Sequence, residues 1–531
     1  MENVQKKSYA LPIAVMFALF FMIAFVTNFA GSMGVIVKNQ FGASNALSQL
    51  GTLANFIAYA FMGIPAGIIL KRKGYKFTSL AAVTVGFVGV GIQFLSGYAE
   101  SFLVYVLGAF VAGFSMCLLN IVVNPMLNTL GGGGNKGNQL IQLGGSCNSI
   151  GATLAPVLLG YLIGGSVEDA NVMQAAPAMI IAMAIFALAA IIIALTKIPE
   201  PHMETAEERA ARLGGKVKKD KYGPMSFRHF VLGAVAIFFY VGIEVGIPNI
   251  ANLYMTTPTT EQAQQTIDKY LAQNVEAEPA TEDESVLEEV VAEEAAAAEE
   301  AAVEGDEAVV AVEEAVADDV VVAEENAPAT EDVDVESAEA VEDDVVSVEK
   351  YQKALDVTGG KAVPGLGMGA DIAGLIIAAY WFLMMCGRLI GSALGAKISS
   401  KNMLIGVSTL ATLFVLCIMF VSSSTNLAIP FTDYVVPANL IFVALCGLCT
   451  SIMWGGIFNL AAEGLGKYTP AASGIFMAMV CGGGIIPALQ GLLADFVGYM
   501  TSYWLIVACL CYLLFYALVG CKNVNKDIPT E

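Results

Sequence analysis

Apolar runs of about 20 residues recur along the whole chain, and they constrain its fold more than any other feature. A helix that crosses a bilayer needs about 20 mostly apolar residues, because the hydrocarbon offers no water to the backbone. Only 14% of the 531 residues are charged, against about 25% in soluble domains, which disfavours a large soluble enzyme. Twelve runs qualify as membrane spans: 10–37, 48–70, 77–98, 101–129, 138–165, 176–197, 229–255, 368–396, 402–422, 437–461, 470–494 and 500–521.

The basic residues predict how these spans are oriented. Cytoplasmic segments of membrane proteins are enriched in Lys and Arg. If the N-terminus is inside, 20 of the 26 basic residues fall in cytoplasmic segments, and one, Arg388, lies within a span. The five on the outer side are Lys38, Lys269, Lys350, Lys353 and Lys361. We therefore expect an all-α, multi-pass protein of a bacterial cytoplasmic (inner) membrane, with both termini in the cytoplasm.

The twelve spans form two halves of six. The polar linker 198–228 separates the halves, and PVLLG at 156–160 in the fifth span is similar to PALQG at 487–491 in the eleventh. Two related six-helix bundles are the architecture of major facilitator transporters, whose substrate sites lie near the midplane between the halves. The expected parts are the N-terminal bundle 1–197, the linker 198–228, the C-terminal bundle 229–255 with 368–522, the insert 256–367 and the tail 523–531.

The insert 256–367 is strongly acidic. It holds 32 Asp and Glu against 4 Lys and Arg, whereas the other 419 residues hold 16 against 22. Like charges repel and aromatic residues are scarce, so we expect a mostly disordered extracytoplasmic insertion. An alternative is a surface that attracts cations or docks a periplasmic partner. The basic body has no patch with interleaved aromatics, so no nucleic-acid partner is expected.

Two ionisable side chains, Glu244 and Arg388, stand clearly inside spans seven and eight. Charge at membrane depth is costly, so such groups are functional candidates by default. Glu244 is the candidate for a site that binds H⁺ or Na⁺. Arg388 is the candidate for a gate, a substrate contact or the partner of Glu244, and a fixed ion pair that only holds the bundle together is the alternative.

Amides and aromatic rings supply the candidate substrate contacts. Asn and Gln are donor and acceptor at once, which suits a neutral ligand rich in hydroxyl groups. Each amide alone could equally be an interhelical hydrogen bond. Aromatic rings could stack on a sugar, with lipid-facing or interfacial rings as the alternative, which fits Tyr503 and Trp504 better. The candidates for substrate binding are Asn28, Asn120, Asn124, Gln142, Asn148 and Trp381, with Tyr380 and Trp454 as further aromatic candidates.

Enzyme chemistry has no support in the sequence. The only histidines, His202 and His229, lie in or beside the linker, far in sequence from any set of intramembrane carboxylates. Cys446 and Cys449 form a single CxxC within an apolar run, which indicates small hydrophobic residues rather than a metal or redox site. We expect no catalytic residues, no cofactor and no metal.

Several longer motifs resemble the fucose–galactose–glucose:cation symporter family of the major facilitator superfamily. The most specific is SIMWGGIFNLAAEGLGKYTPAASGIFMAMVCGGGIIPALQGLLAD at 451–495. The others are YVGIEV (240–245), YWFLMMCGRLIGS (380–392), IPAGIILKRKGYK (64–76), NPMLNTLG (124–131) and NSIGATLAP (148–156). The resemblance implies a sugar transporter of the cytoplasmic membrane, typically driven by protons and in some relatives by Na⁺.

The chain departs from that family at two positions. The fucose–proton symporter of the family has functional carboxylates in its first and fourth helices, where this sequence aligns Gly31 and Asn120. Neither residue can ionise, so the resemblance implies coupling at another group, for which Glu244 is the candidate, coupling to Na⁺, or no coupling.

These observations predict secondary active uptake of a monosaccharide of the hexose or deoxyhexose class by alternating access, coupled to H⁺ or Na⁺. An uncoupled sugar facilitator is one alternative. A membrane receptor or display protein that works through the acidic insert is another. We expect a monomer whose partners are the sugar, the coupling ion and membrane lipid.

Overall fold

A computed structural model describes residues 10–130, 134–164, 170–196, 198, 200, 222–259, 262, 364–394, 398–428, 435–525 and 527–529. The chain divides into two units, one of Met1–Thr260 with Gln352–Glu531 and one of Glu261–Tyr351. The expected linker 198–228 and the acidic insert 256–367 fall mostly outside the described residues. The helices and strands of the described residues belong to the first unit.

The described part of this unit is almost entirely helical. In the N-terminal half the elements are α1 (Ala10–Ser32), α2 (Gly34–Gln40), α3 (Asn45–Ser48), α4 (Leu50–Tyr98), α5 (Phe102–Leu130), α6 (Gly134–Ile163), η1 (Val172–Ala175) and α7 (Ala176–Leu195). In the C-terminal half they are η2 (Pro224–Ser226), α9 (Arg228–Thr256), α13 (Ala370–Leu394), α14 (Ser400–Phe420), β1 (Asn426–Ala428), β2 (Val435–Pro437), α15 (Asn439–Thr450), α16 (Met453–Ala462), η3 (Gly466–Tyr468), α17 (Thr469–Met479), α18 (Gly482–Val497), α19 (Tyr499–Ser502), α20 (Trp504–Phe515) and η4 (Tyr516–Gly520).

Eleven helical segments of the described chain are long and apolar enough to cross a membrane. One of them, Leu50–Tyr98, has 49 residues, which is more than twice the length that one crossing needs. Its backbone leaves the helical region at Gly74, where φ is +82°, a conformation that favours glycine. The segment therefore contains two of the predicted spans, 48–70 and 77–98, and the twelve predicted crossings are all accounted for.

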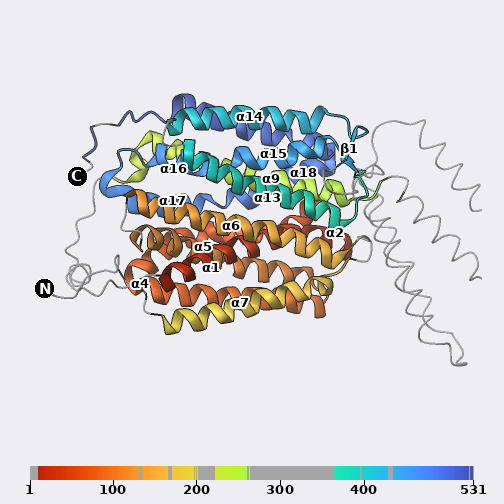
Figure 1. Cartoon of the computed structure of the whole chain (residues 1–531), viewed down its shortest axis with the longest axis horizontal. Helices are drawn as coiled ribbons and strands as arrows, with labels where there is room; N and C mark the ends of the chain where they lie inside the picture. Colours follow the sequence, from red (N-terminus) through yellow and green to blue (C-terminus); the bar gives the residue numbers. More distant parts are fainter. Residues whose placement is uncertain are drawn as a thin grey trace, which may run out of the picture. The chain divides into compact units, whose positions relative to one another are not determined.

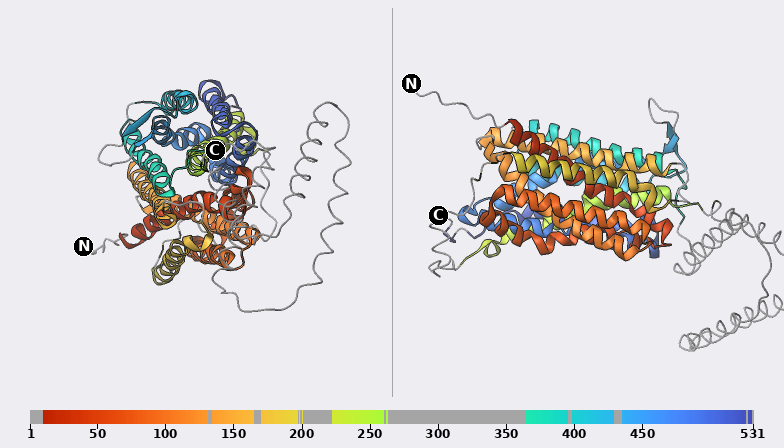
Figure 2. Two further views of the ribbon diagram at one scale, coloured as in Figure 1. Left: turned by 90° about the vertical axis from the view of Figure 1, so that its right-hand side faces the viewer. Right: turned by 90° about the horizontal axis from the view of Figure 1, so that it is seen from below.

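The helices of the two halves form two groups that lie side by side, red to yellow and green to blue in Figure 1 and in the end-on view of Figure 2. α1 begins and η4 ends at one end of the bundle, which we call the termini end. The start of α9 is at this end too, because the Arg228 amide donates to Asn525 Oδ1 at 3.0 Å. The antiparallel pair β1–β2 lies at the opposite end.

Large apolar side chains cover the outside of the bundle. Leu103, Tyr161, Leu195 and Phe496 are each at least 77% exposed. In water such a surface would promote association, but in lipid it faces a solvent of its own kind. Trp504 is half exposed, as expected for a lipid-facing ring. Tyr503 was also expected to face lipid or the membrane interface, and that prediction is wrong. Its side chain is fully buried, and its hydroxyl donates to the Ile247 carbonyl at 2.9 Å.

Candidate functional site

A cavity of about 710 Å³ lies between the two halves. α1, α4, α5 and α6 line it from the N-terminal half, and α9, α13, α14, α16 and α17 from the C-terminal half. The side chain of Gln142 lies outside the part of the chain that the structure describes. The other predicted site residues all line this one cavity: Asn28, Asn120, Asn124, Asn148, Glu244, Trp381 and Arg388.

The cavity extends from the middle of the helices toward the termini end. Gly391 near the end of α13, Ser400 at the start of α14 and Asn459 on α16 line it, and these positions lie at or near the termini end. At its other limit the lining includes Gly31 on α1 and Asn249 on α9. The cavity thus reaches toward one end of the bundle and stops short of the other.

Amide side chains form the polar part of the N-terminal wall, and each is held by its own NH₂ group. Asn28 donates to the Ala24 carbonyl at 2.9 Å and Asn148 to the Phe20 carbonyl at 3.0 Å. Asn120 and Asn124 share one face of α5, as their spacing of four predicts. Asn120 donates to the Tyr59 hydroxyl at 3.0 Å and Asn124 to the Asn120 carbonyl at 3.1 Å.

This bonding determines what the wall offers a ligand. Each NH₂ group donates at least one hydrogen bond within the N-terminal half, whereas among the described residues no donor reaches the four Oδ1 atoms. The wall therefore presents fixed acceptors to the cavity. Such a wall is suited to hydroxyl groups, which bring donors of their own.

The charged part of the cavity belongs to the C-terminal half. Arg388 Nη2 lies 3.8 Å from Glu244 Oε1, and both side chains are less than one-fifth exposed. This separation is longer than that of a charge-assisted hydrogen bond, about 2.7–2.9 Å. The two charges therefore attract each other without being locked together, and Glu244 keeps room for another partner.

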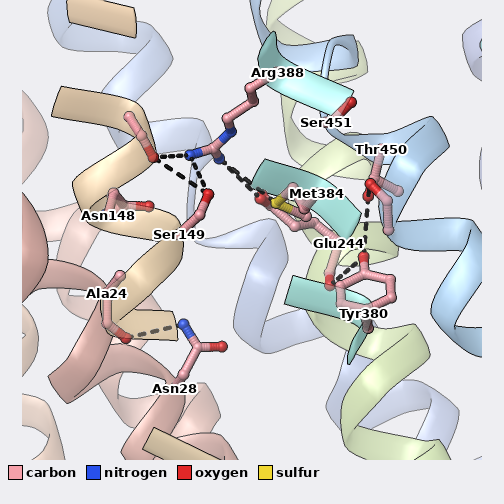
Figure 3. A network of polar contacts seen from close by, with 12 residues as sticks. Ala24, Asn28, Asn148, Ser149, Glu244, Tyr380, Met384, Arg388, Thr450 and Ser451 are labelled. Carbon is pink, nitrogen blue, oxygen red and sulfur yellow. Dashed lines mark hydrogen bonds and ion pairs between the residues drawn. The ribbon is translucent and has the colours of Figure 1, made fainter. Parts of the chain in front are cut away.

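Arg388 also connects the two halves. Its Nη1 donates to the Gly145 carbonyl at 2.8 Å and to Ser149 Oγ at 3.2 Å, both on α6 (Figure 3). The guanidinium can do this because its donors point in fixed, divergent directions. One side chain therefore contacts the carboxylate of its own half and the backbone of the other half.

The backbone around Glu244 is shaped by Pro248. A proline has no N–H to donate to the carbonyl four residues earlier, so the Glu244 carbonyl loses its helical partner. The hydroxyl of fully buried Tyr380 donates to that carbonyl at 3.0 Å and lies 3.1 Å from Thr450 Oγ1 (Figure 3). Tyr380 thus holds the backbone of α9 at Glu244. The sequence predicted a ring that stacks on the sugar, and this different role was not predicted.

Two tryptophans supply the aromatic surface. Trp381 and Trp454 both line the cavity, from α13 and α16. Trp454 packs against Tyr240, with ring centroids 6.1 Å apart, and Trp381 lies edge-on to Tyr380 at 5.1 Å. Neither indole is lipid-facing, so both favour the stacking interpretation over the lipid-facing one.

Gly31, aligned with a family carboxylate, lies directly against the side chain of Asn249. A Cβ there would lie 2.8 Å from Asn249 Oδ1, on α9 of the other half. Asn249 is itself held across the halves, because its Nδ2 donates to Gln49 Oε1 at 3.0 Å and to Thr52 Oγ1 at 3.4 Å. Asn249 was not among the predicted site residues, although an amide beside Pro248 in an apolar run is the kind of signal that selected the others.

The structure resembles a crystal structure of the fucose:proton symporter of Escherichia coli, with a TM-score of 0.54 and 18% identity over 97% of this chain and 99% of that chain. Residues 15–271 match the family model described as Major Facilitator Superfamily. This chain has the major facilitator fold, and residues 15–271 are similar in sequence to that superfamily.

Curated relatives within this superfamily match nearly the whole chain. A glucose/galactose transporter of Brucella abortus is 24% identical over 98% of this chain and 97% of its own length. A putative glucose/galactose transporter of Helicobacter pylori is 23% identical over 98% and 100%. These similarities confirm the family resemblance inferred from the sequence motifs.

Proposed function

We propose that the protein is a secondary active transporter that takes up a monosaccharide of the hexose or deoxyhexose class across the cytoplasmic membrane by alternating access, coupled to H⁺ or Na⁺. The observation that carries the proposal is the cavity between the halves. One wall holds fixed amide acceptors, and the other holds two indole rings and the Glu244–Arg388 pair. The relatives named for glucose, galactose and fucose transport support the same substrate class.

In this proposal the sugar lies between the two walls. Its hydroxyl groups donate to the oxygens of Asn28, Asn120, Asn124 and Asn148, and an apolar face of the ring stacks on Trp381 or Trp454. A cavity of about 710 Å³ is within the range of about 300–1,000 Å³ typical of small-molecule sites.

Glu244 is proposed to bind the coupling ion. When H⁺ or Na⁺ neutralises the carboxylate, its attraction for Arg388 falls, and the Arg388 bonds to α6 then change in strength. Ion binding is thereby linked to the contact between the halves, which coupling by alternating access requires. The basic residues predict that the termini end lies in the cytoplasm, and with that orientation a cavity that reaches this end would face inward.

The test is uptake of radiolabelled sugars into proteoliposomes with imposed H⁺ or Na⁺ gradients. The variant is Glu244→Gln, and Glu463→Gln, an exposed carboxylate outside the cavity lining, is the matched control. We expect one gradient to drive accumulation in the wild type and the control. The Glu244→Gln protein should exchange sugar without accumulating it.

One observation favours a second candidate, an uncoupled facilitator. Gly31 and Asn120 cannot ionise, and a side chain at position 31 would meet the side chain of Asn249. If neither gradient drives accumulation while wild type and variant both equilibrate sugar, the facilitator replaces the symporter. If no hexose, deoxyhexose or pentose crosses the membrane, the proposed substrate class is wrong.

A further inference from the structure

A charged cluster joins the two halves at the end of the bundle opposite the termini. Its centre is the ammonium group of Lys38, on α2 of the N-terminal half. Lys38 Nζ donates to Asn45 Oδ1 at 2.9 Å in its own half, and to Thr257 Oγ1 and the Tyr499 hydroxyl, each at 2.8 Å, in the other. The ammonium has three donors, and all three are used here.

A carboxylate of the C-terminal half completes this Lys38 cluster. Asp495 accepts hydrogen bonds from the backbone amides of Asn45 at 2.8 Å and Ala46 at 2.9 Å, both in the N-terminal half. Gly491, one turn earlier on α18, lets the two backbones approach, because a Cβ there would lie 2.7 Å from the Asn45 carbonyl oxygen. Lys38 of the N-terminal half thus donates to hydroxyl groups of the C-terminal half, and Asp495 of the C-terminal half accepts from backbone amides of the N-terminal half.

A second set of contacts lies between the cluster and the cavity. Asn249 donates across the halves to Gln49 and Thr52, and its oxygen packs against Gly31. Asn249 and Gly31 line the cavity, whereas none of Lys38, Asn45, Thr257, Asp495 and Tyr499 does. The cavity is therefore closed on this side by two successive layers of polar contacts.

Polar contacts between the halves are unevenly distributed. Between described residues, the side-chain hydrogen bonds that join the halves occur in the Lys38 cluster, around Asn249 and at Arg388. Only those of Lys38 and Asp495 involve a charged group outside the cavity lining. The cluster is thus the charged connection between the halves that no bound ligand would touch.

We propose that the Lys38 cluster is a latch that holds the cavity closed at the opposite end. Separating the halves there takes Thr257 and Tyr499 away from Lys38 and the two amides away from Asp495, and water must replace them. Hydrogen bonds to charged groups are among the strongest in proteins, so the latch determines how often the cavity opens on this side. The inference rests on the movement of the halves in the proposed function, but not on the sugar or the coupling ion.

Distances between spin labels test the latch directly. One pair, on Leu47 and Val435, reports the opposite end, and a second, on Leu195 and Leu518, reports the termini end; all four side chains are at least 44% exposed. Labels attached to genetically encoded azide-bearing residues leave the ten native cysteines in place. Double electron–electron resonance in nanodiscs without sugar then gives the populations of the closed and open states.

The variants are Lys38→Met and Asp495→Asn. Lys401→Met is the matched control, because Lys401 Nζ donates to the Leu518 carbonyl at 3.3 Å, within the C-terminal half. We expect each latch variant to raise the ratio of the long to the short Leu47–Val435 distance about tenfold, the effect of losing one or two charged hydrogen bonds. The Leu195–Leu518 distance should shorten in the same samples. The control should match the wild type.

Unchanged distance distributions in Lys38→Met and Asp495→Asn would overturn the latch. If either protein fails to fold, Tyr499→Phe removes one hydroxyl and keeps the ring, and it should shift the ratio in the same direction by a smaller factor. Distances that shift in a protein that carries none of the tested sugars would leave the latch standing and remove the proposed function. If sugar crosses the membrane while these distances stay unchanged, the latch is overturned and the proposed function stands.

Discussion

The two walls of the cavity differ in chemistry and in how they are held. The N-terminal wall presents neutral amides, each tied to its own half by an NH₂ bond. The C-terminal wall carries the only charges among the described lining residues, Glu244 and Arg388, and Arg388 reaches across to α6. In the proposed function the two walls therefore have different roles. The N-terminal wall provides a fixed binding surface, and the C-terminal wall provides Glu244, the group that binds the ion.

The substitution expected to have the largest effect on the C-terminal wall is Arg388→Leu. It leaves the Glu244 charge without its partner in the largely buried wall of the cavity and removes both bonds to α6. Removing one member of a buried pair costs roughly 3–5 kcal/mol, and the partial exposure of this pair puts the expected loss of folding stability near the lower figure. Gradient-driven uptake should fall at least about 100-fold, measured in proteoliposomes.

The double variant Glu244→Gln/Arg388→Leu distinguishes the effect of losing the ion pair from the effect of leaving the Glu244 carboxylate without a partner. Its melting temperature in detergent should be higher than that of Arg388→Leu alone, because no uncompensated carboxylate is left. A double variant less stable than both single variants would show that the two residues stabilise the protein independently.

Truncating the N-terminal wall should have a moderate effect. In Asn28→Ala and Asn148→Ala, one acceptor for a sugar hydroxyl is lost, at a cost of about 0.5–1.5 kcal/mol. We expect the KM for sugar to rise about 2- to 12-fold, while the dependence on the ion gradient stays as in the wild type. A change in ion dependence would contradict the division between the walls. Gln93→Ala, a buried amide outside the cavity lining, is the control.

The smallest effect is expected from Tyr380→Phe. The ring and its packing are kept, and the hydroxyl contacts with the Glu244 carbonyl and Thr450 Oγ1 are lost, at about 1 kcal/mol for each hydrogen bond. The maximal rate of coupled uptake should fall about 2- to 5-fold with an unchanged KM, because the carboxylate is positioned less well. A raised KM without loss of rate would indicate that Tyr380 contacts the sugar instead.

The spans and much of the site were predictable from the sequence for one physical reason. A bilayer penalises polar groups over a fixed length, so apolar runs indicate the helices and the polar residues within them indicate the site. This argument selected Asn28, Asn148, Glu244 and Arg388, which line one cavity.

Contacts between residues far apart in the sequence were not predictable in this way. Asn249 meets Gln49 and Gly31 only because two halves pack together, and Lys38 appears in the sequence only as one of five basic residues in the outer segments. Neighbours on one helix show the same limit, because fully buried Tyr503 and half-exposed Trp504 differ in the face they occupy and not in hydropathy.

The bond from Arg388 to the Gly145 carbonyl has a genetic consequence. Every amino acid carries a main-chain carbonyl, so substitutions at position 145 leave the acceptor in place, and a Cβ there would lie at an ordinary 3.6 Å from Arg388 Nη1. The contact therefore depends on the side chain at position 388 but not on the side chain at position 145. In homologous sequences the arginine would be constrained while its partner position drifted, and covariation between the two would fail to reveal that they touch.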